Sequence, residues 1–500
     1  MVTSSIFAYG IFTDEYIIAK WLGLCVLLCL YVLAIIFRRK VDYKQHAECF
    51  IATSTLSSIV LCTICIWQST IEDYTYYDAT GTFDNVAGVI ACVCPIFPLG
   101  LYYVKDKKLL TVLYVGITVA TILLLHSRTA FISITITFIF FELKNRKILG
   151  QKRSFMGMCI VACLFFIVFL FMMYEKKNST IGHSLVWKVT MNMLSDTPLN
   201  GFGMGGFRQH YMDYQAAYFM QNPNSVYTQY ADNTQTPFNE IILLIINWGF
   251  IGAIFILALL IVVIYGYRCS HSQYKNYALL SCVAIGILAC FSYPFSYPTT
   301  WSVLSLNLCI LNKEAIEKLR EYIKVDILRL VVCIVTVIML SFVMQRAGYE
   351  WLWAKTEKQG EDYSNKLIKY FDENPYFAYS RAMKAISRGE NCIAIQQLEK
   401  CEAVWADYDV SLYMGLLYYA NNDMDSAIKH LTKAHYMCPN RFYPLHYIAE
   451  AYKQTNQHKK AYVLSQEIIA KKEKIPSNDI DFFKFVARKY IIDQHKTINP

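Results

Sequence analysis

A glycine-rich stretch followed by an arginine and a histidine is the part of the chain whose residue types best suit anion chemistry. It begins at residue 201, contains Gly203 and Gly205, and continues into Arg208 and His210. Glycine lets the backbone approach a ligand closely, so main-chain N–H groups can surround a phosphate. A plain tight turn explains the glycines about equally well. Because no strand precedes them, the pattern does not indicate a dinucleotide site.

Two arginines are candidates for binding a diphosphate. Arg128 follows Ser127 in a short turn at the end of an apolar segment, and Arg208 directly follows the glycine-rich stretch. An arginine can bind two phosphate oxygens at once, so the two residues together suit two phosphates. The alternatives are that Arg128 extends to lipid headgroups and that Arg208 is a solvated loop charge.

Three further residues could transfer protons or orient a substrate. His183 and His210 could serve as acid or base, although an isolated loop histidine is more often structural. Glu240 begins an apolar segment, where it could cap a helix or orient an acceptor hydroxyl group. We therefore predict His183, His210 and Glu240 as catalytic residues, and Arg128, Arg208, Gly203 and Gly205 as substrate-binding residues.

The composition is typical of a membrane protein. Of the 500 residues, 55% are apolar and 17% are charged, against about 25% charged residues in soluble domains. The mean hydropathy is +0.31. The net charge of +9 comes from basic residues beside apolar segments, so we expect no nucleic-acid partner. Most of the 17 cysteines lie within apolar segments, where they act as small hydrophobic residues, and we predict neither a metal site nor a cofactor.

Ten segments are apolar enough to be candidate membrane spans, which need about 20 residues each. They are residues 17–37, 49–67, 86–104, 109–125, 130–143, 155–174, 241–267, 278–291, 301–311 and 327–344. Nineteen Lys and Arg residues lie in one set of connecting loops and five in the other. The more basic side of a membrane protein faces the cytoplasm. We therefore expect the long 175–240 loop and everything after residue 344 to lie outside.

The tail from residue 346 to residue 500 is polar and contains a repeat. Small and aromatic residues recur at the spacing of a tetratricopeptide repeat, at Gly415, Tyr418, Ala427, Leu431, Ala434 and Pro439. Part of this pattern returns 34 residues later and 33 residues earlier. We predict an all-α protein, with a transmembrane bundle of about ten spans in residues 1–345 and an extracytoplasmic tetratricopeptide-like solenoid in 346–500. The tail would suit a protein partner, and an unrelated helical bundle is the alternative.

Several short stretches resemble motifs of the O-antigen ligase and polymerase family of bacterial membrane glycosyltransferases. The glycine-rich residues 201–207 resemble one motif, and residues 237–240, which lead into 248–252, resemble another. Residues 127–130 are similar to the family's Ser-Arg turn. Residues 81–85 and 292–295 resemble stretches of family members that also have a tetratricopeptide tail. The resemblance adds Asn239 to the substrate-binding candidates.

The resemblance implies an O-antigen ligase-like enzyme of surface polysaccharide biosynthesis in the bacterial inner membrane. The donor would be a glycan on a polyprenyl diphosphate carrier, and the acceptor a lipid or glycan on the outer face, both reached among membrane lipids. A repeat-unit polymerase of the same family is the nearest alternative. Two alternatives from other classes are a transporter or flippase and a scaffold whose membrane part only anchors the repeat domain. The family's histidine before the Asn-Glu pair is missing here, because Thr236 or Phe238 takes its place.

Overall fold

The computed structural model describes residues 12, 14, 16–37, 43–72, 75, 78–145, 177–322 and 325–498. The described residues form helices joined by turns and contain no strand, as an all-α fold requires. The chain divides into two compact units. The first comprises residues 1–175, 238–241 and 254–367, and the second comprises residues 176–237, 242–253 and 368–500.

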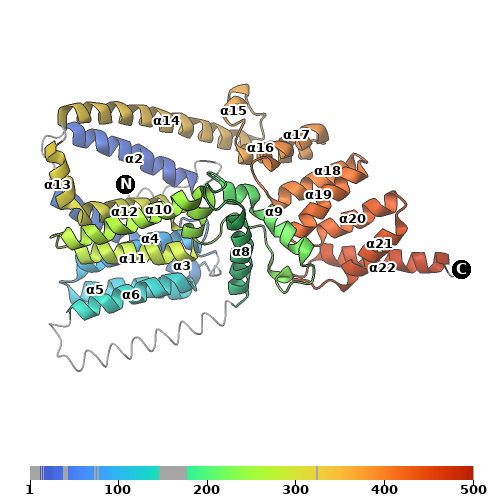
Figure 1. Ribbon diagram of the computed structural model, residues 1–500, viewed down its shortest axis with the longest axis horizontal. Helices are drawn as coiled ribbons and strands as arrows, with labels where there is room; N and C mark the ends of the chain where they lie inside the picture. The colour runs from blue at the N-terminus through green and yellow to red at the C-terminus, as the bar shows by residue number, and fades with distance from the viewer. Residues whose placement is uncertain are drawn as a thin grey trace. The chain divides into compact units, whose positions relative to one another are not determined.

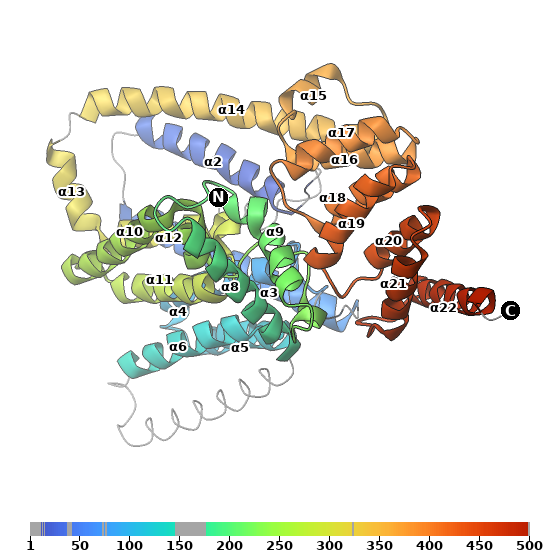
Figure 2. The ribbon, with the colours of Figure 1, turned by 45° about the vertical axis from the view of Figure 1, so that its right-hand side comes forward.

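The first unit contains the apolar helices. They are α2 (Ile18–Phe37), α3 (Tyr43–Thr70), α4 (Val86–Val104), α5 (Lys108–Leu124), α6 (Arg128–Asn145), α11 (Lys275–Phe291), α12 (Pro298–Leu311) and α14 (Val325–Gln359), with the ends of α10 (Glu240–Cys269) and the short α13 (Lys313–Tyr322). Helix α4 packs against α3, α5, α6, α11 and α12, and most of its side chains are buried. Helices α2 and α14 lie side by side in both views (Figures 1 and 2).

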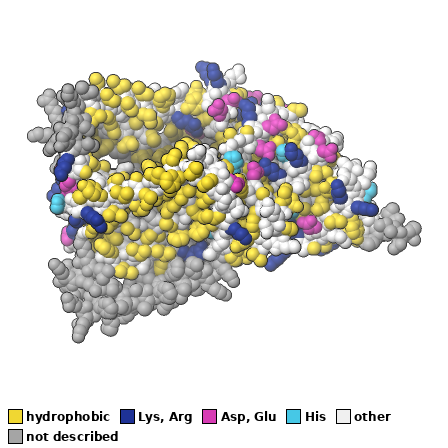
Figure 3. Space-filling model, viewed as in Figure 1, with side chains coloured by type: hydrophobic (Ala, Val, Ile, Leu, Met, Phe, Trp, Pro, Cys, Tyr) yellow, Lys and Arg dark blue, Asp and Glu magenta, His cyan; other side chains and the backbone are white. Residues whose placement is uncertain are grey.

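Five of these helices are long and apolar enough to cross a membrane, namely α2, α3, α4, α10 and α14. Helices α5, α6, α11 and α12 are apolar but shorter, and they coincide with four of the other predicted spans. The predicted span at 155–174 lies outside the described residues. Exposed apolar side chains cover α10 and α14, and Figure 3 shows hydrophobic atoms over one face of this part of the chain. Such a surface is stable in lipid rather than in water.

The second unit joins the long loop to the tail. The loop forms α8 (Lys177–Asp196), α9 (Gly206–Gln221) and the single turn η2 (Thr228–Tyr230). After α15 (Asn365–Tyr370), the tail forms α16 (Pro375–Ser387), α17 (Asn391–Glu402), α18 (Tyr408–Ala420), α19 (Met424–Met437), α20 (Tyr443–Gln454), α21 (His458–Ala470) and α22 (Asn478–Ile498). We call α16 to α22 the repeat domain.

Successive helices of the repeat domain pack in pairs, α16 with α17, α18 with α19 and α20 with α21 (Figure 1). A Cβ atom on Gly415 would lie 2.6 Å from Cγ of Leu431, so this glycine lets α18 and α19 approach closely. Ala427, Leu431 and Ala434 are fully buried. These contacts agree with the predicted register, while the assignment of the helices as tetratricopeptide repeats stays a prediction.

Candidate functional site

The glycine-rich stretch packs against a break in helix α10. At Gly249 the backbone leaves helical geometry, with φ at 55° and ψ at −136°. The carbonyl oxygens of Ile246 and Asn247 on α10 accept hydrogen bonds from the amides of Phe202 (2.8 Å) and Gly203 (2.9 Å). Because a buried carbonyl needs a partner, amides of the glycine-rich stretch take the place of helical ones. The Gly203 amide is therefore engaged with α10, and a role for Gly203 and Gly205 in binding a substrate stays a prediction.

Two glycines permit this contact. The amide of Phe250 donates to the carbonyl of Leu199 at 3.0 Å rather than to its own helix. A Cβ atom on Gly249 would lie 2.3 Å from that carbonyl oxygen, and one on Gly201 would lie 2.5 Å from the carbonyl oxygen of Ile246. Both clashes are with backbone, which cannot rotate away as a side chain can. Both glycines also have positive φ, where other residues are strained.

Helix α9 begins directly after the glycines and carries two of the predicted residues. Its N-terminal residue follows Gly205, which has φ at 82°. Arg208 donates a hydrogen bond to the hydroxyl of Tyr376 and lies 5.6 Å from the centre of that ring. The His210 ring packs against Phe202, with the two ring centres 4.8 Å apart. The start of α9 therefore brings Gly203, Gly205, Arg208 and His210 into one short segment.

His183 lies on α8 and is half-buried. Helix α8 packs against α9 and η2, so His183 belongs to the same unit as Arg208 and His210. On this helix Trp187 donates its indole N–H to the carbonyl of Pro237 at 3.0 Å. That bond ties α8 to the end of the long loop, just before Asn239 and Glu240.

Asn239 and Glu240 belong to the first unit and are held by the last turn of α11 and by the segment that follows it. The Asn239 amide donates to the carbonyl of Cys290 at 2.9 Å. Oε1 of Glu240 accepts the backbone N–H of Phe295 at 3.1 Å, which fixes the orientation of the carboxylate. Glu240 is half-buried at the first turn of α10. The position of Glu240 is compatible with capping α10 and with contacting the acceptor substrate.

The same turn, residues 292–297, holds polar residues that the sequence analysis did not single out. The hydroxyl of Tyr297 donates to Asp84 at 3.0 Å and lies 3.1 Å from Oδ1 of Asn85, which caps α4. Burial raises the pKa of Asp84, and the Tyr297 hydrogen bond partly offsets that rise. Lys20 near the start of α2 is fully buried, and its ammonium donates to the carbonyl of Thr82 at 2.6 Å.

Lys20 could have been identified from the sequence, because a lysine inside an apolar span is rare and usually functional. Its cost of burial is reduced by the Thr82 carbonyl and by the face of Phe83, whose centre lies 4.6 Å from the ammonium nitrogen. Lys20 and Asp84 are therefore additional candidates for the site in the first unit.

Arg128 is the first residue of α6 and is half-buried. The preceding Ser127 is buried, and its hydroxyl oxygen accepts the amide of Ala130 at 3.4 Å, which caps the helix. His126, just before, has φ at 48°, so the chain turns sharply here as the Ser-Arg turn predicts. Arg128 shares the first unit with Asn239 and Glu240, while the other five predicted residues lie in the second unit.

Among the described residues, no group of three or more His, Cys, Asp or Glu side chains lies close enough together to hold a metal ion.

Residues 113–257 match the Wzy_C family model, described as O-antigen ligase. The match runs from α5 to a point just after the break in α10, and it includes all eight predicted site residues. The N-terminal helices α2 to α4 and the repeat domain lie outside it. No curated protein and no solved structure matches the chain significantly. The match and the five long apolar helices support an O-antigen ligase-like membrane enzyme of surface polysaccharide synthesis.

Proposed function

We propose that the chain transfers a glycan from a polyprenyl diphosphate carrier to a lipid-linked or glycan acceptor at the outer face of the bacterial inner membrane. The observation that supports this most is the extent of the O-antigen ligase match, which contains the Ser-Arg turn, the glycine-rich stretch, α9 and the Asn-Glu pair. The five long apolar helices suit a substrate with a hydrocarbon tail. The charge distribution of the loops supports the outer location.

In the proposed reaction, a hydroxyl oxygen of the acceptor attacks the anomeric carbon of the donor sugar. The new carbon–oxygen bond forms as the bond to the diphosphate oxygen breaks, and the diphosphate leaves with the electron pair. The proton of the attacking hydroxyl passes to a base, for which Glu240, His183 and His210 are the candidates. Arg128 and Arg208 would neutralise the charge that develops on the leaving diphosphate.

The test is transfer by the full chain in lipid nanodiscs, supplied with a purified lipid-linked glycan and an acceptor. We expect one polyprenyl diphosphate to be released for each glycan transferred. A single added glycan on a lipid acceptor indicates a ligase, and a ladder of repeats indicates a polymerase. Movement of the intact donor across a vesicle membrane, without diphosphate release, would contradict the proposal and indicate a flippase.

A further inference from the structure

The repeat domain has polar residues at one position of successive repeats. Asn374, Asp407 and Asn440 are each 33 residues apart, at the turn before a helix pair. Asn374 caps α16 and Asp407 caps α18 through side-chain oxygens that accept backbone amides. Equivalent positions in a helical repeat lie along one edge of the stack. The edge formed by Asp407 and Asn440 is covered by the chain's own loop, as the next contacts show.

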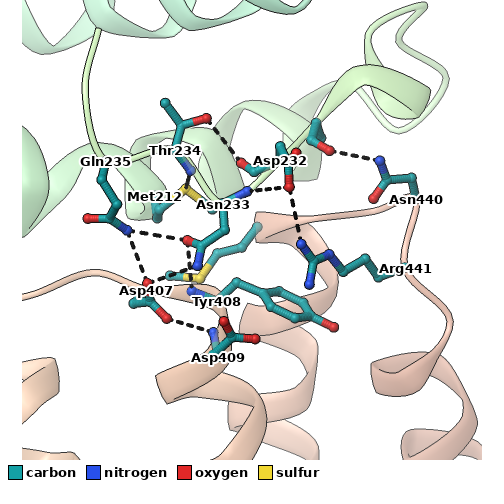
Figure 4. A network of polar contacts seen from close by, with 12 residues as sticks. Met212, Asp232, Asn233, Thr234, Gln235, Asp407, Tyr408, Asp409, Asn440 and Arg441 are labelled. Carbon is teal, nitrogen blue, oxygen red and sulfur yellow. Dashed lines mark hydrogen bonds and ion pairs between the residues drawn. The ribbon is translucent and has the colours of Figure 1, made fainter. Parts of the chain in front are cut away.

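We call residues 206–235 the docked segment. Asp407 holds it with one carboxylate oxygen while the other caps the helix. Oδ1 of Asp407 accepts the amides of Asp409 (2.8 Å) and Val410 (3.2 Å) at the start of α18. Oδ2 accepts the side-chain amides of Asn233 (2.9 Å) and Gln235 (3.0 Å) from the docked segment (Figure 4). A carboxylate that accepts four N–H groups has its acceptor capacity fully used.

The second contact lies one repeat further on. The Asn440 side chain, which is buried, donates to the carbonyl of Ala231 at 2.7 Å and to that of Gln229 at 3.2 Å. Next to it, the Arg441 guanidinium pairs with Asp232 at 3.1 Å (Figure 4). Because Asn440 binds backbone carbonyls, its contacts do not depend on the side chains at 229 and 231. Asn440 therefore constrains the path of the loop backbone.

Helix α9 of the docked segment packs along α19. Gln215, which is fully buried, donates to the carbonyl of Met437 at 2.6 Å, in the last turn of α19. The last carbonyls of a helix lack helical partners, so Gln215 satisfies one of them. Lys433 on α19 pairs with Asp213 of α9 at 2.9 Å and with Glu402 of the repeat domain at 3.0 Å. Burial opposes the charged form of Lys433, but the two carboxylates outweigh it and raise its pKa.

The docked segment is also the segment that carries two predicted site residues. The carbonyl of Arg208 accepts the backbone amide of Ala406 at 3.2 Å, directly before Asp407. The side chain of Gln209 donates to the carbonyl of Ala403 at 3.2 Å. The repeat domain therefore holds the Arg208 carbonyl and the Gln209 side chain, as well as the distant end of the segment at residues 229–235.

From these contacts we propose that the repeat domain binds the docked segment of the same chain, and that Asp407 and Asn440 are positioning residues for Arg208 and His210. The positioning role rests on the proposed glycan transfer, whereas the docking itself does not. A repeat edge already filled by its own chain is closed to a separate protein, so a foreign partner would have to use another face.

The experiment exchanges donor and acceptor at the Asp407 contact in the full chain in nanodiscs. Asp407→Asn keeps an oxygen for the cap but sets an amide against the amides of Asn233 and Gln235. Gln235→Glu keeps the acceptor for Trp405 but sets two carboxylates together. The pair D407N/Q235E again places a donor opposite an acceptor at residue 235, while the Asn233 amide still faces an amide. Asp423→Asn is the matched control, because Asp423 caps α19 through Ser426 and is exposed.

The first readout is amide hydrogen exchange in residues 206–235. We expect each single change to speed this exchange about tenfold or more, and the pair to exchange more slowly than either single change because one of the two contacts is regained. Asp423→Asn should leave it unchanged, and exchange in α20 and α21 should report an intact repeat domain throughout. Asn440 caps no helix, so Asn440→Asp removes only its contacts with the docked segment. This change should also speed exchange in 206–235. Wild-type exchange there in both Asp407→Asn and Asn440→Asp would overturn the docking.

The second readout is glycan transfer. We expect kcat to fall with each single change and to recover in part in the pair, which a general loss of folding would not do. Faster exchange with undiminished transfer would overturn the positioning role. A wild-type chain that transfers no glycan would contradict the proposed function, and the exchange measurements would then decide the docking alone.

Discussion

Gly249 is a residue at which a single added methyl group should be strongly disruptive. A Cβ atom there would lie 2.3 Å from the carbonyl oxygen of Leu199 and 2.4 Å from its carbon, both backbone atoms. The backbone conformation at Gly249 costs a residue with a side chain about 1–3 kcal/mol. Moving the two backbones apart also breaks the bonds of Phe202, Gly203 and Phe250, each of which contributes about 0.5–1.5 kcal/mol.

Together these losses amount to about 3 kcal/mol or more, which corresponds to at least about a hundredfold in local opening. We therefore expect Gly249→Ala to speed hydrogen exchange in residues 200–205 by that factor and to reduce glycan transfer strongly. Gly348→Ala is the control, because a Cβ at this position of α14 meets nothing within 4 Å and alanine favours a helix. Exchange in 200–205 at the wild-type rate after Gly249→Ala would refute the account of the break.

Four other outcomes are expected. Arg128→Lys keeps the charge but cannot bind two phosphate oxygens at once, so it should lose much of the transfer activity at matched protein levels. Arg128→Ala should reduce the rate of transfer about 30- to 1000-fold. Wild-type transfer by Arg128→Ala would remove Arg128 from the site. Gly415→Leu should overpack the contact with Leu431 and cost about 1–3 kcal/mol or more, visible as faster exchange in α18 and α19, and unchanged exchange would refute the register. Burial lowers the pKa of His435 from 6.5 to about 3. Between these values the unfolded chain takes up a proton that the folded chain does not, so the free energy of unfolding is highest above pH 6.5 and decreases as the pH falls towards 3. The loss is about 2 kcal/mol between pH 7 and pH 5; His435→Leu should flatten the pH dependence of thermal unfolding, and an unaltered slope would contradict this. Alkaline phosphatase fused after residue 350 should be active, whereas an active cytoplasmic reporter there would mean that a span has been miscounted.

The apolar helices could be predicted closely because each depends on its own residues. The predicted span 86–104 coincides with α4, and 17–37 differs from α2 by one residue. Helix α14 runs to residue 359, well past its predicted end at 344, because Arg346 and Glu350 continue the helix with a salt bridge one turn apart.

The features that were missed depend on residues far apart in the sequence. The span at 241–267 was predicted as one helix, because the amides that stabilise its break come from residues 202 and 203. Likewise, Asn233 and Asp407 are 174 residues apart, and each alone has the composition of a solvated turn. The loop and the tail were therefore predicted as separate regions, whereas both belong to the second compact unit.

The break in α10 has a consequence for membrane depth. The whole helix has 30 residues and would be about 45 Å long, more than the roughly 30 Å of a hydrocarbon core. The part from residue 250 to residue 269 would by itself be about 30 Å long. If this part fills the hydrocarbon core, Gly249 falls at one boundary of the core, at the level of the lipid headgroups. A polyprenyl carrier whose tail stays in the hydrocarbon presents its diphosphate at this same level, so the proposed transfer requires no step that lifts the lipid out of the bilayer.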